Sequence, residues 1–126
     1  MKLQKFKNLE VWRKAMNFVE IIYRVTQEFP SSELYGLTSQ LRRASTSIAL
    51  NIAEGSGAGT DPEFKRFLNI SIRSSYESVC AIEISSRLQY MTPQKKEELL
   101  ADLDEISAML VGLSKRLRVK GLLNGR

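Results

Sequence analysis

Few residues of this chain have the types and spacing that catalysis requires. The sequence contains no histidine, which removes the commonest general acid/base, the commonest transition-metal ligand and any histidine-activated nucleophile. Glu54, Glu77 and Glu83 could act as acid/base groups, but no metal-ligand spacing or nucleophile accompanies them. The glycine-rich run EGSGAG follows a helical pattern, whereas a phosphate-binding loop follows a strand and carries Lys-Ser or Lys-Thr. These residues predict a protein that is not an enzyme and holds no metal or cofactor.

The chemistry that the sequence favours is the binding of phosphate groups by cations near the two chain ends. The net charge is +5, but residues 1–14 and 115–126 together carry +9, which leaves −4 for residues 15–114. Nucleic acid would be held mainly through its phosphates, with little reading of base sequence. The predicted contacts are Lys5, Lys7, Arg42, Lys115, Arg116, Arg118 and Lys120. The alternative is that these cations are solvated ends that keep the protein soluble.

Aromatic residues give little support for base stacking. Most of them recur at the spacing of a helix core, and only Phe6 and Tyr90 are expected to be free to stack on bases.

A polar stripe runs along the segment between residues 40 and 54. At 100° per residue, Gln40, Arg43, Ser47, Asn51 and Glu54 lie together at the margin of an apolar arc. Arg43 and Glu54 are about 16 Å apart along the helix axis, too far to pair with each other. Each needs a partner elsewhere, which a second copy of the chain could supply. The alternative is an ordinary hydrated helix face.

Apolar residues also recur on a second face, away from the predicted core. A row at helical spacing on such a face usually marks a protein partner. Together the stripe and the row predict a homo-oligomer with an interface made of Gln40, Arg43, Ser47, Leu50, Asn51, Glu54, Ile70, Ala81, Ile84 and Leu88.

The elements that would position these residues are four helices. Breaks at FPSS (29–32), GSGAGTD (55–61) and Met91-Thr92 separate segments whose apolar residues recur at about 100° per residue, with no sustained alternation. Long helices and short connections predict an all-α, up-down-up-down antiparallel four-helix bundle. We expect one domain over 1–126, with a basic N-terminal arm (1–8) and a basic C-terminal tail (118–126). In this topology both basic ends meet at one pole.

Helix ends and the single cysteine give further expectations. Asp61, before Pro62, and Thr92, before Pro93, are predicted N-caps, and Gly55 is predicted to follow the end of its helix. Cys80 cannot form an internal disulfide and is predicted to be a small buried side chain. With no signal-peptide pattern and no run of ~20 apolar residues, we expect a cytoplasmic protein that does not enter a membrane.

The sequence resembles the 23S ribosomal RNA intervening-sequence protein family of bacterial four-helix bundles. The resemblance rests on LEVWRKA (9–15), FPSSELYGLTSQLRRASTSIALNIAEGSG (29–57), EFKRFLNISIRSSYES (63–78) and the leucine-spaced last segment. One departure is Arg73, where the family often has glycine. The resemblance implies a homo-oligomer, a ring-shaped pentamer, and a link to RNA or another nucleic acid.

Two functions remain open at this point. One is a non-enzymatic homo-oligomer that binds nucleic acid, RNA above all, through a basic pole. The other is a structural adaptor whose outward face docks a partner protein, with charge serving solubility and steering.

Overall fold

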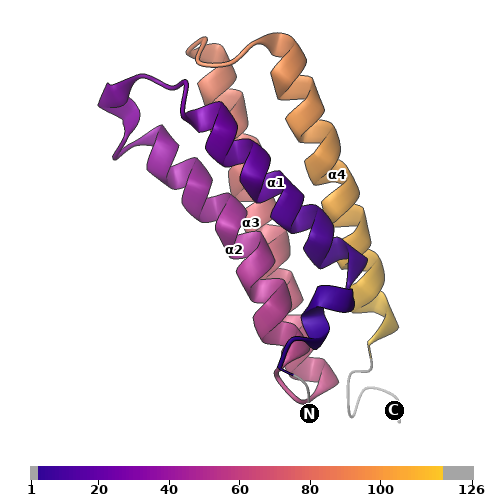
Figure 1. The fold of residues 1–126 in the computed structure, drawn as a ribbon. Coiled ribbons are helices and arrows are strands. Elements are labelled where there is room, and N and C mark those ends of the chain that lie inside the picture. Colours follow the sequence, from indigo (N-terminus) through magenta and orange to yellow (C-terminus); the bar gives the residue numbers. More distant parts are fainter. Residues whose placement is uncertain (1–2, 118–126) are drawn as a thin grey trace.

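The structure, a computed structural model, describes residues 3–117 and consists of helices (Figure 1). The four long helices are α1 (Glu10–Thr26), α2 (Leu37–Ser56), α3 (Asp61–Arg87) and α4 (Pro93–Arg116). Two 3-10 turns, η1 (Lys5–Asn8) and η2 (Ser31–Glu33), precede α1 and α2. Because no strand occurs within 3–117, the all-α prediction is confirmed. No helix in this part of the chain is long and apolar enough to cross a membrane.

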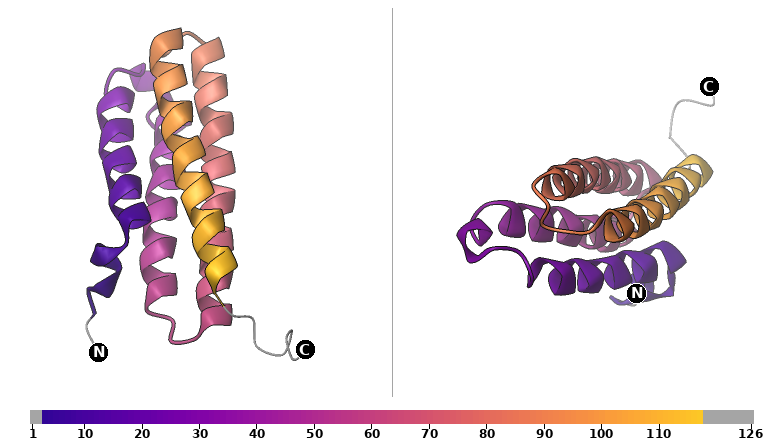
Figure 2. Two further views of the ribbon diagram at one scale, coloured as in Figure 1. Left: turned by 90° about the vertical axis from the view of Figure 1, so that its right-hand side faces the viewer. Right: turned by 90° about the horizontal axis from the view of Figure 1, so that it is seen from above.

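Consecutive helices run in opposite directions and form a bundle (Figure 2). Within the described residues the backbone of each helix lies close to those of two others, in the order α1–α2–α3–α4–α1, and the backbones of diagonally opposed helices lie farther apart. The α2–α3 seam is the most extensive contact and the α1–α4 seam the least. As a result the α2–α3 side and the α1–α4 side of the bundle face away from each other.

The core follows the predicted periodicity on α2 and α4 and is shifted on α1. Its fully buried side chains include Leu41, Ile48, Ile52, Leu99, Leu103, Ile106 and Leu110, all expected from their spacing. On α1 the buried centre is Val11, Ala15, Phe18 and Ile22. Tyr23 also lies within the apolar arc of α1, at helical spacing from Val19 and Thr26, but it is 42 % exposed. The apolar arc of α1 covers about half the helix, so only neighbouring helices decide which part of it faces inward.

Five serines of α3 are buried, and two of them, Ser71 and Ser74, form hydrogen bonds to α2. Ser71, Ser74, Ser75, Ser78 and Ser85 are all buried. The Ser71 hydroxyl donates to the carbonyl oxygen of Ile48 on α2 (2.9 Å), whereas Ser78 donates to the carbonyl of Ser74 within its own helix (2.9 Å). Small side chains at these positions allow the two helix axes to approach closely.

Two of the predicted helix ends are wrong. Thr60, not Asp61, is the N-cap of α3, and its hydroxyl accepts a hydrogen bond from the Glu63 backbone N–H (3.3 Å). Gly55 does not follow α2 but lies in its last turn and is buried, with Gly57 as the C-cap. The predicted Thr92 cap of α4 is confirmed, with a hydrogen bond from the Lys95 N–H (3.1 Å).

Cys80 was expected to be buried, but it is exposed because it lies on the solvent side of α3.

Side-chain contacts fasten the end of the bundle where α3 meets α4. The Glu33 carboxylate accepts from the Leu37 N–H (3.0 Å) at the start of α2 and from the Tyr90 hydroxyl (2.9 Å). The hydrogen bond to this carboxylate raises the pKa of Tyr90. The Tyr90 ring also packs on Phe29, at 5.5 Å between centroids. Tyr90 is therefore engaged within the fold, contrary to the expectation that it is free to stack on bases.

Phe6 is engaged as well. Its ring meets the ring of Trp12 edge-on at 5.0 Å, which holds η1 against α1. The expectation of a free Phe6 is therefore also wrong.

Candidate functional site

Cations gather at the end of the bundle that contains the α2–α3 connection. The antiparallel order brings η1 and the start of α1, the end of α2, the start of α3 and the end of α4 to this end (Figure 2). We call the described cations here the basic pole: Lys5, Lys7, Lys65, Arg66, Lys115 and Arg116. Neither residues 3–9 nor residues 106–117 contain an acidic residue. Arg118 and Lys120, also predicted as contacts, lie outside the described residues.

The members of the basic pole differ in how far the fold already engages them. The Lys65 ammonium donates to the carbonyl oxygen and the hydroxyl of Ser114, so it stabilises the negative end of α4. Arg66 pairs with Glu63 (3.1 Å) and lies 4.6 Å from the Phe67 ring centroid. These two cations have structural roles that the sequence did not reveal.

Four cations of the pole remain available to a ligand. Lys5, Lys115 and Arg116 are exposed and form no ion pair with another described residue. Lys7 is exposed too and has only a neutral partner, the side-chain oxygen of Gln4 (2.8 Å). A phosphate can therefore contact these four groups without first breaking an ion pair.

The basic pole also has a hollow of about 360 Å³ beside Lys5. Its lining comes from η1, the α2–α3 connection and the end of α4, and it includes Leu9, Phe64 and Leu117. Gly59 lies at its edge with φ +93°, a backbone conformation that favours glycine. Of the four free cations, Lys5 thus lies at the wall of a concave surface, which it shares with Asp61.

Arg42, the second candidate for nucleic-acid contact, lies away from the basic pole, between α1 and α2. Its guanidinium donates to the Thr26 hydroxyl (2.8 Å) and to the Tyr23 carbonyl oxygen (3.4 Å) at the end of α1. It also lies 4.5 Å from the Tyr23 ring centroid. The structure therefore gives Arg42 a role in joining these helices.

Arg42→Gln tests that role. We expect it to lower the free energy of unfolding by about 1 kcal/mol, because it removes a charged hydrogen bond and a cation–π contact at a partly exposed site. RNA affinity should stay within about twofold of wild type, since a surface cation contributes to nucleic-acid binding only where phosphate can reach it. Urea unfolding and a filter-binding titration measure the two quantities. A large loss of affinity with unchanged stability would return Arg42 to the ligand site.

The predicted polar stripe lies along the α2–α3 seam, and its middle is bonded within the chain. The Ser74 hydroxyl of α3 donates to the Ser47 hydroxyl (2.8 Å), and the Asn51 amide donates to the Ser47 hydroxyl (3.0 Å) and carbonyl (2.9 Å). Ser47 and Asn51 are thus half-buried and do not need a second copy to satisfy them. This differs from the expectation that the stripe is completed from outside.

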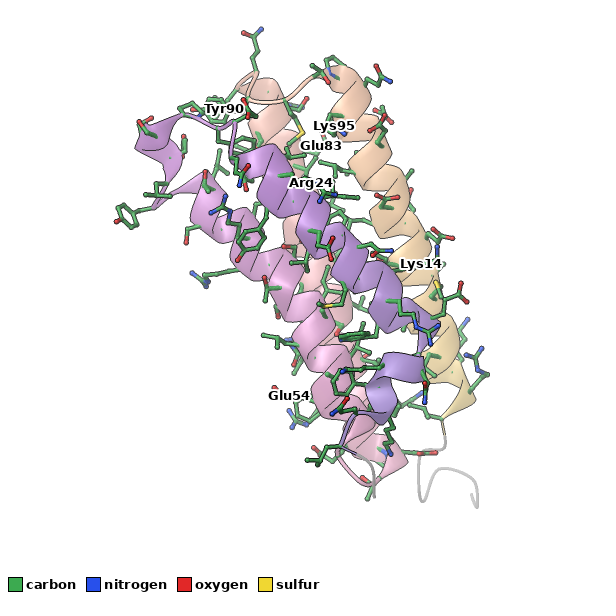
Figure 3. The ribbon with its side chains drawn as sticks, viewed as in Figure 1. Lys14, Arg24, Glu54, Glu83, Tyr90 and Lys95 are labelled. Carbon is green, nitrogen blue, oxygen red and sulfur yellow. The ribbon has the colours of Figure 1, made fainter. Side chains whose placement is uncertain are left out.

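The ends of the stripe are exposed to solvent and are not bonded within the described part of the chain. Gln40, Arg43 and Glu54 are exposed and make no side-chain hydrogen bond or ion pair within residues 3–117. Figure 3 shows Glu54 near the end of α2 that reaches the basic pole.

The apolar part of the predicted interface lies on the same side of the bundle, with one exception. Leu50, Ile84 and Leu88 are about half exposed, and Ile70 is partly buried. Ala81 is only 4 % exposed and belongs to the core, so its placement in an interface is wrong. The error arose because the tight α2–α3 seam covers more of the circumference of α3 than its apolar arc indicates. We call the exposed set Arg43, Leu50, Glu54, Ile84 and Leu88 the α2–α3 face.

A polar cleft in the upper part of this side was missed from the sequence. It has a volume of about 280 Å³ and is lined mainly by polar groups, among them Gln40, Arg43 and Glu77. Tyr35 also lines it and is 93 % exposed. The position of Glu77 opposite Arg43 could have been predicted from the antiparallel pairing of α2 with α3. The position of Tyr35 could not, because this residue precedes α2 and belongs to no helical pattern.

The three glutamates that could have been acid/base groups do not form a site. Glu54 and Glu77 lie on the α2–α3 side, whereas Glu83 pairs with Lys96 of α4 (3.7 Å). In the part of the chain that the structure describes, no three acidic or cysteine residues are placed to hold a metal ion.

Comparisons with known proteins agree with this architecture. A family model described as 23S rRNA-intervening sequence protein matches residues 7–112. A crystal structure of a protein of unknown function, from the S23 ribosomal protein family of Bacteroides thetaiotaomicron VPI-5482, superposes with a TM-score of 0.78 and 26 % sequence identity. That alignment covers 83 % of this chain and 95 % of the other. A comparison with curated proteins finds no match.

Proposed function

Because this chain belongs to the 23S rRNA-intervening sequence protein family, we propose that it is a non-enzymatic, self-associating bundle that binds RNA through the phosphate contacts of its basic pole. The observation that carries the proposal is the set of four exposed cations, Lys5, Lys7, Lys115 and Arg116, which lack an acidic partner at one end of the fold. The family name adds RNA as the nucleic acid to test first.

Self-association would strengthen this binding. One copy offers only four free cations at the described part of its basic pole, and each phosphate neutralised adds to the salt dependence of binding. Several copies that present their poles to one RNA would multiply the number of contacts and give an avidity that a single copy lacks. The exposed apolar residues of the α2–α3 face support self-association, since such a row usually marks a protein partner.

Charge reversal at the pole tests the proposal. We expect the double variant Lys115→Glu, Arg116→Glu to bind a labelled RNA at least about tenfold more weakly at ~100 mM salt, with a salt slope smaller by about 2. The matched control is Arg24→Glu, Arg87→Glu, which makes the same change in charge. Both arginines are exposed, form no ion pair with another described residue and lie in the last turns of α1 and α3, at the other end of the bundle; Figure 3 shows Arg24 there. Fluorescence anisotropy across ~50 to ~200 mM salt measures both.

The results separate RNA binding from the adaptor role. Equal losses in the two double variants would show a diffuse charge effect without a defined pole. Absence of RNA binding by the wild-type chain at low salt would favour a scaffold that docks a partner protein.

A further inference from the structure

Two hollows lie along the α1–α4 side of the bundle. Near the basic pole a hollow of about 390 Å³ lies between the two helices, with a mainly apolar lining of Leu9, Val11, Ala108, Met109, Gly112 and Leu113, and with Glu10 and Arg116 at its edge. Farther along the same seam a second hollow of about 210 Å³ contains Lys14, Asp102 and Glu105. Both occur along the least extensive helix contact of the bundle.

Packing within residues 3–117 does not explain why position 112 is glycine. A glycine inside a helix costs about 1 kcal/mol relative to alanine. A Cβ atom at this position would meet only the far end of Arg116, at 3.9 Å. No packing contact among the described residues therefore requires glycine here. Because Gly112 has no side chain, it leaves this part of the apolar hollow open to a group from outside.

The α2–α3 face has a matching sequence of groups. On α2, Arg43 lies seven residues before the exposed Leu50, which places it about 10.5 Å farther from the basic pole. On α4, Asp102 in the second hollow lies seven residues before Met109 in the first, and it is likewise about 10.5 Å farther from the pole. Both helices run toward the pole, so the two series have the same order, direction and spacing.

We propose that Leu50 of one copy inserts into the α1–α4 hollow beside Met109 and Gly112 of a second copy, while Arg43 meets Asp102. The inference rests on the proposed self-association and names the two surfaces that would form it. The contact is head-to-tail, because it joins two different faces of the protomer, and such contacts build rings or filaments instead of closed two-fold dimers. It also orients all copies alike, so their basic poles point the same way.

The charges of the second hollow favour this arrangement. Lys14 pairs with Glu105 (3.3 Å), which leaves Asp102 without an ion pair in the described residues. Partial burial, together with the negative charge of Glu105, raises the pKa of Asp102, although Lys14 opposes the shift. Among the described residues the Arg43 side chain has no hydrogen-bond or ion-pair partner. Its guanidinium would supply the positive charge that this carboxyl group lacks.

Mixing two broken variants tests the head-to-tail contact. Leu50→Glu disables the α2–α3 face and keeps the hollow, whereas Gly112→Phe fills the hollow and keeps the face. We expect each variant alone to be monomeric by light scattering coupled to size exclusion. A 1:1 mixture should give particles with the mass of two chains, since one intact face meets one intact hollow. A two-fold contact through either face would give no such rescue.

A charge swap supplies an independent check of register. Arg43→Asp and Asp102→Arg should each lower the assembled fraction, and the double variant should restore it. Wild type that is monomeric at all concentrations would end both the inference and the proposed self-association. Wild type that assembles, with variants that also assemble or fail to rescue each other, would overturn the head-to-tail contact and leave self-association standing. Circular dichroism confirms that each variant is folded.

Discussion

Ser78→Leu is expected to destabilise the folded chain by about 3 kcal/mol, because overpacking forces side chains and backbone out of place. Ser78 is fully buried on α3. The larger leucine side chain has no space there unless the neighbouring helices move apart. The stability is measured by urea unfolding followed by circular dichroism.

Ser78→Ala is the matched control. The Ser78 hydroxyl donates to a carbonyl oxygen of its own helix, so its removal leaves no partner on another helix unsatisfied. Alanine also has a higher helix propensity than serine, which offsets the lost hydrogen bond. We expect a change below about 1 kcal/mol. Equal stability of the leucine and wild-type proteins would mean that α3 does not pack on its neighbours as closely as described.

Alanine substitution at the two helical glycines should give effects of opposite sign. A Cβ at Gly55 would lie 2.8 Å from the Phe67 Cβ and 2.8 Å from the Phe64 ring, so the α2–α3 contact must open. We expect Gly55→Ala to cost about 1.5 kcal/mol, as overpacking exceeds the gain in helix propensity. At Gly112 the space is open, so alanine should stabilise the chain by up to about 1 kcal/mol.

The comparison is made by thermal unfolding of both variants at one low protein concentration, because self-association adds to apparent stability. Two changes of the same sign would contradict the distinction between a glycine required by packing and one that packing does not require.

Periodicity and helix-stop signals were enough to predict the architecture. The spacing of Leu99, Leu103, Ile106 and Leu110 identified the core face of α4, and Thr92 with Pro93 identified its start. These features are local, since they depend on residues within one or two turns of each other.

The errors arose where a distant part of the chain decides the outcome. Gly55 was taken for a helix stop because glycine is unfavourable inside helices, but Phe64 and Phe67 of α3 require it within the last turn. Thr60 and Asp61 can both cap a helix, and the extended backbone of Thr60 makes it the cap. The role of Arg42 depends on how α2 crosses the end of α1, which no pattern within either helix specifies.

The candidate site shows the same division. The antiparallel order alone brings the cations to one pole, so their proximity could be predicted. Which cations are free could not, because the partners of Lys65 and Arg66 are set by the side-chain packing between and along helices. The hollow beside Gly112 was also unpredictable, since it depends on how loosely α1 and α4 pack.

The turn η1 and the end of α4 lie at the same end of the bundle (Figure 2). An affinity tag attached directly before Leu3 or directly after Leu117 would therefore lie beside Lys5 or Lys115 and could shield it or contribute charges of its own. Circular permutation offers a remedy, in which a linker joins the original termini and the chain is reopened between the exposed Ser31 and Ser32. A tag on that permuted protein would project from the opposite end, leaving the cations accessible on an immobilised sample.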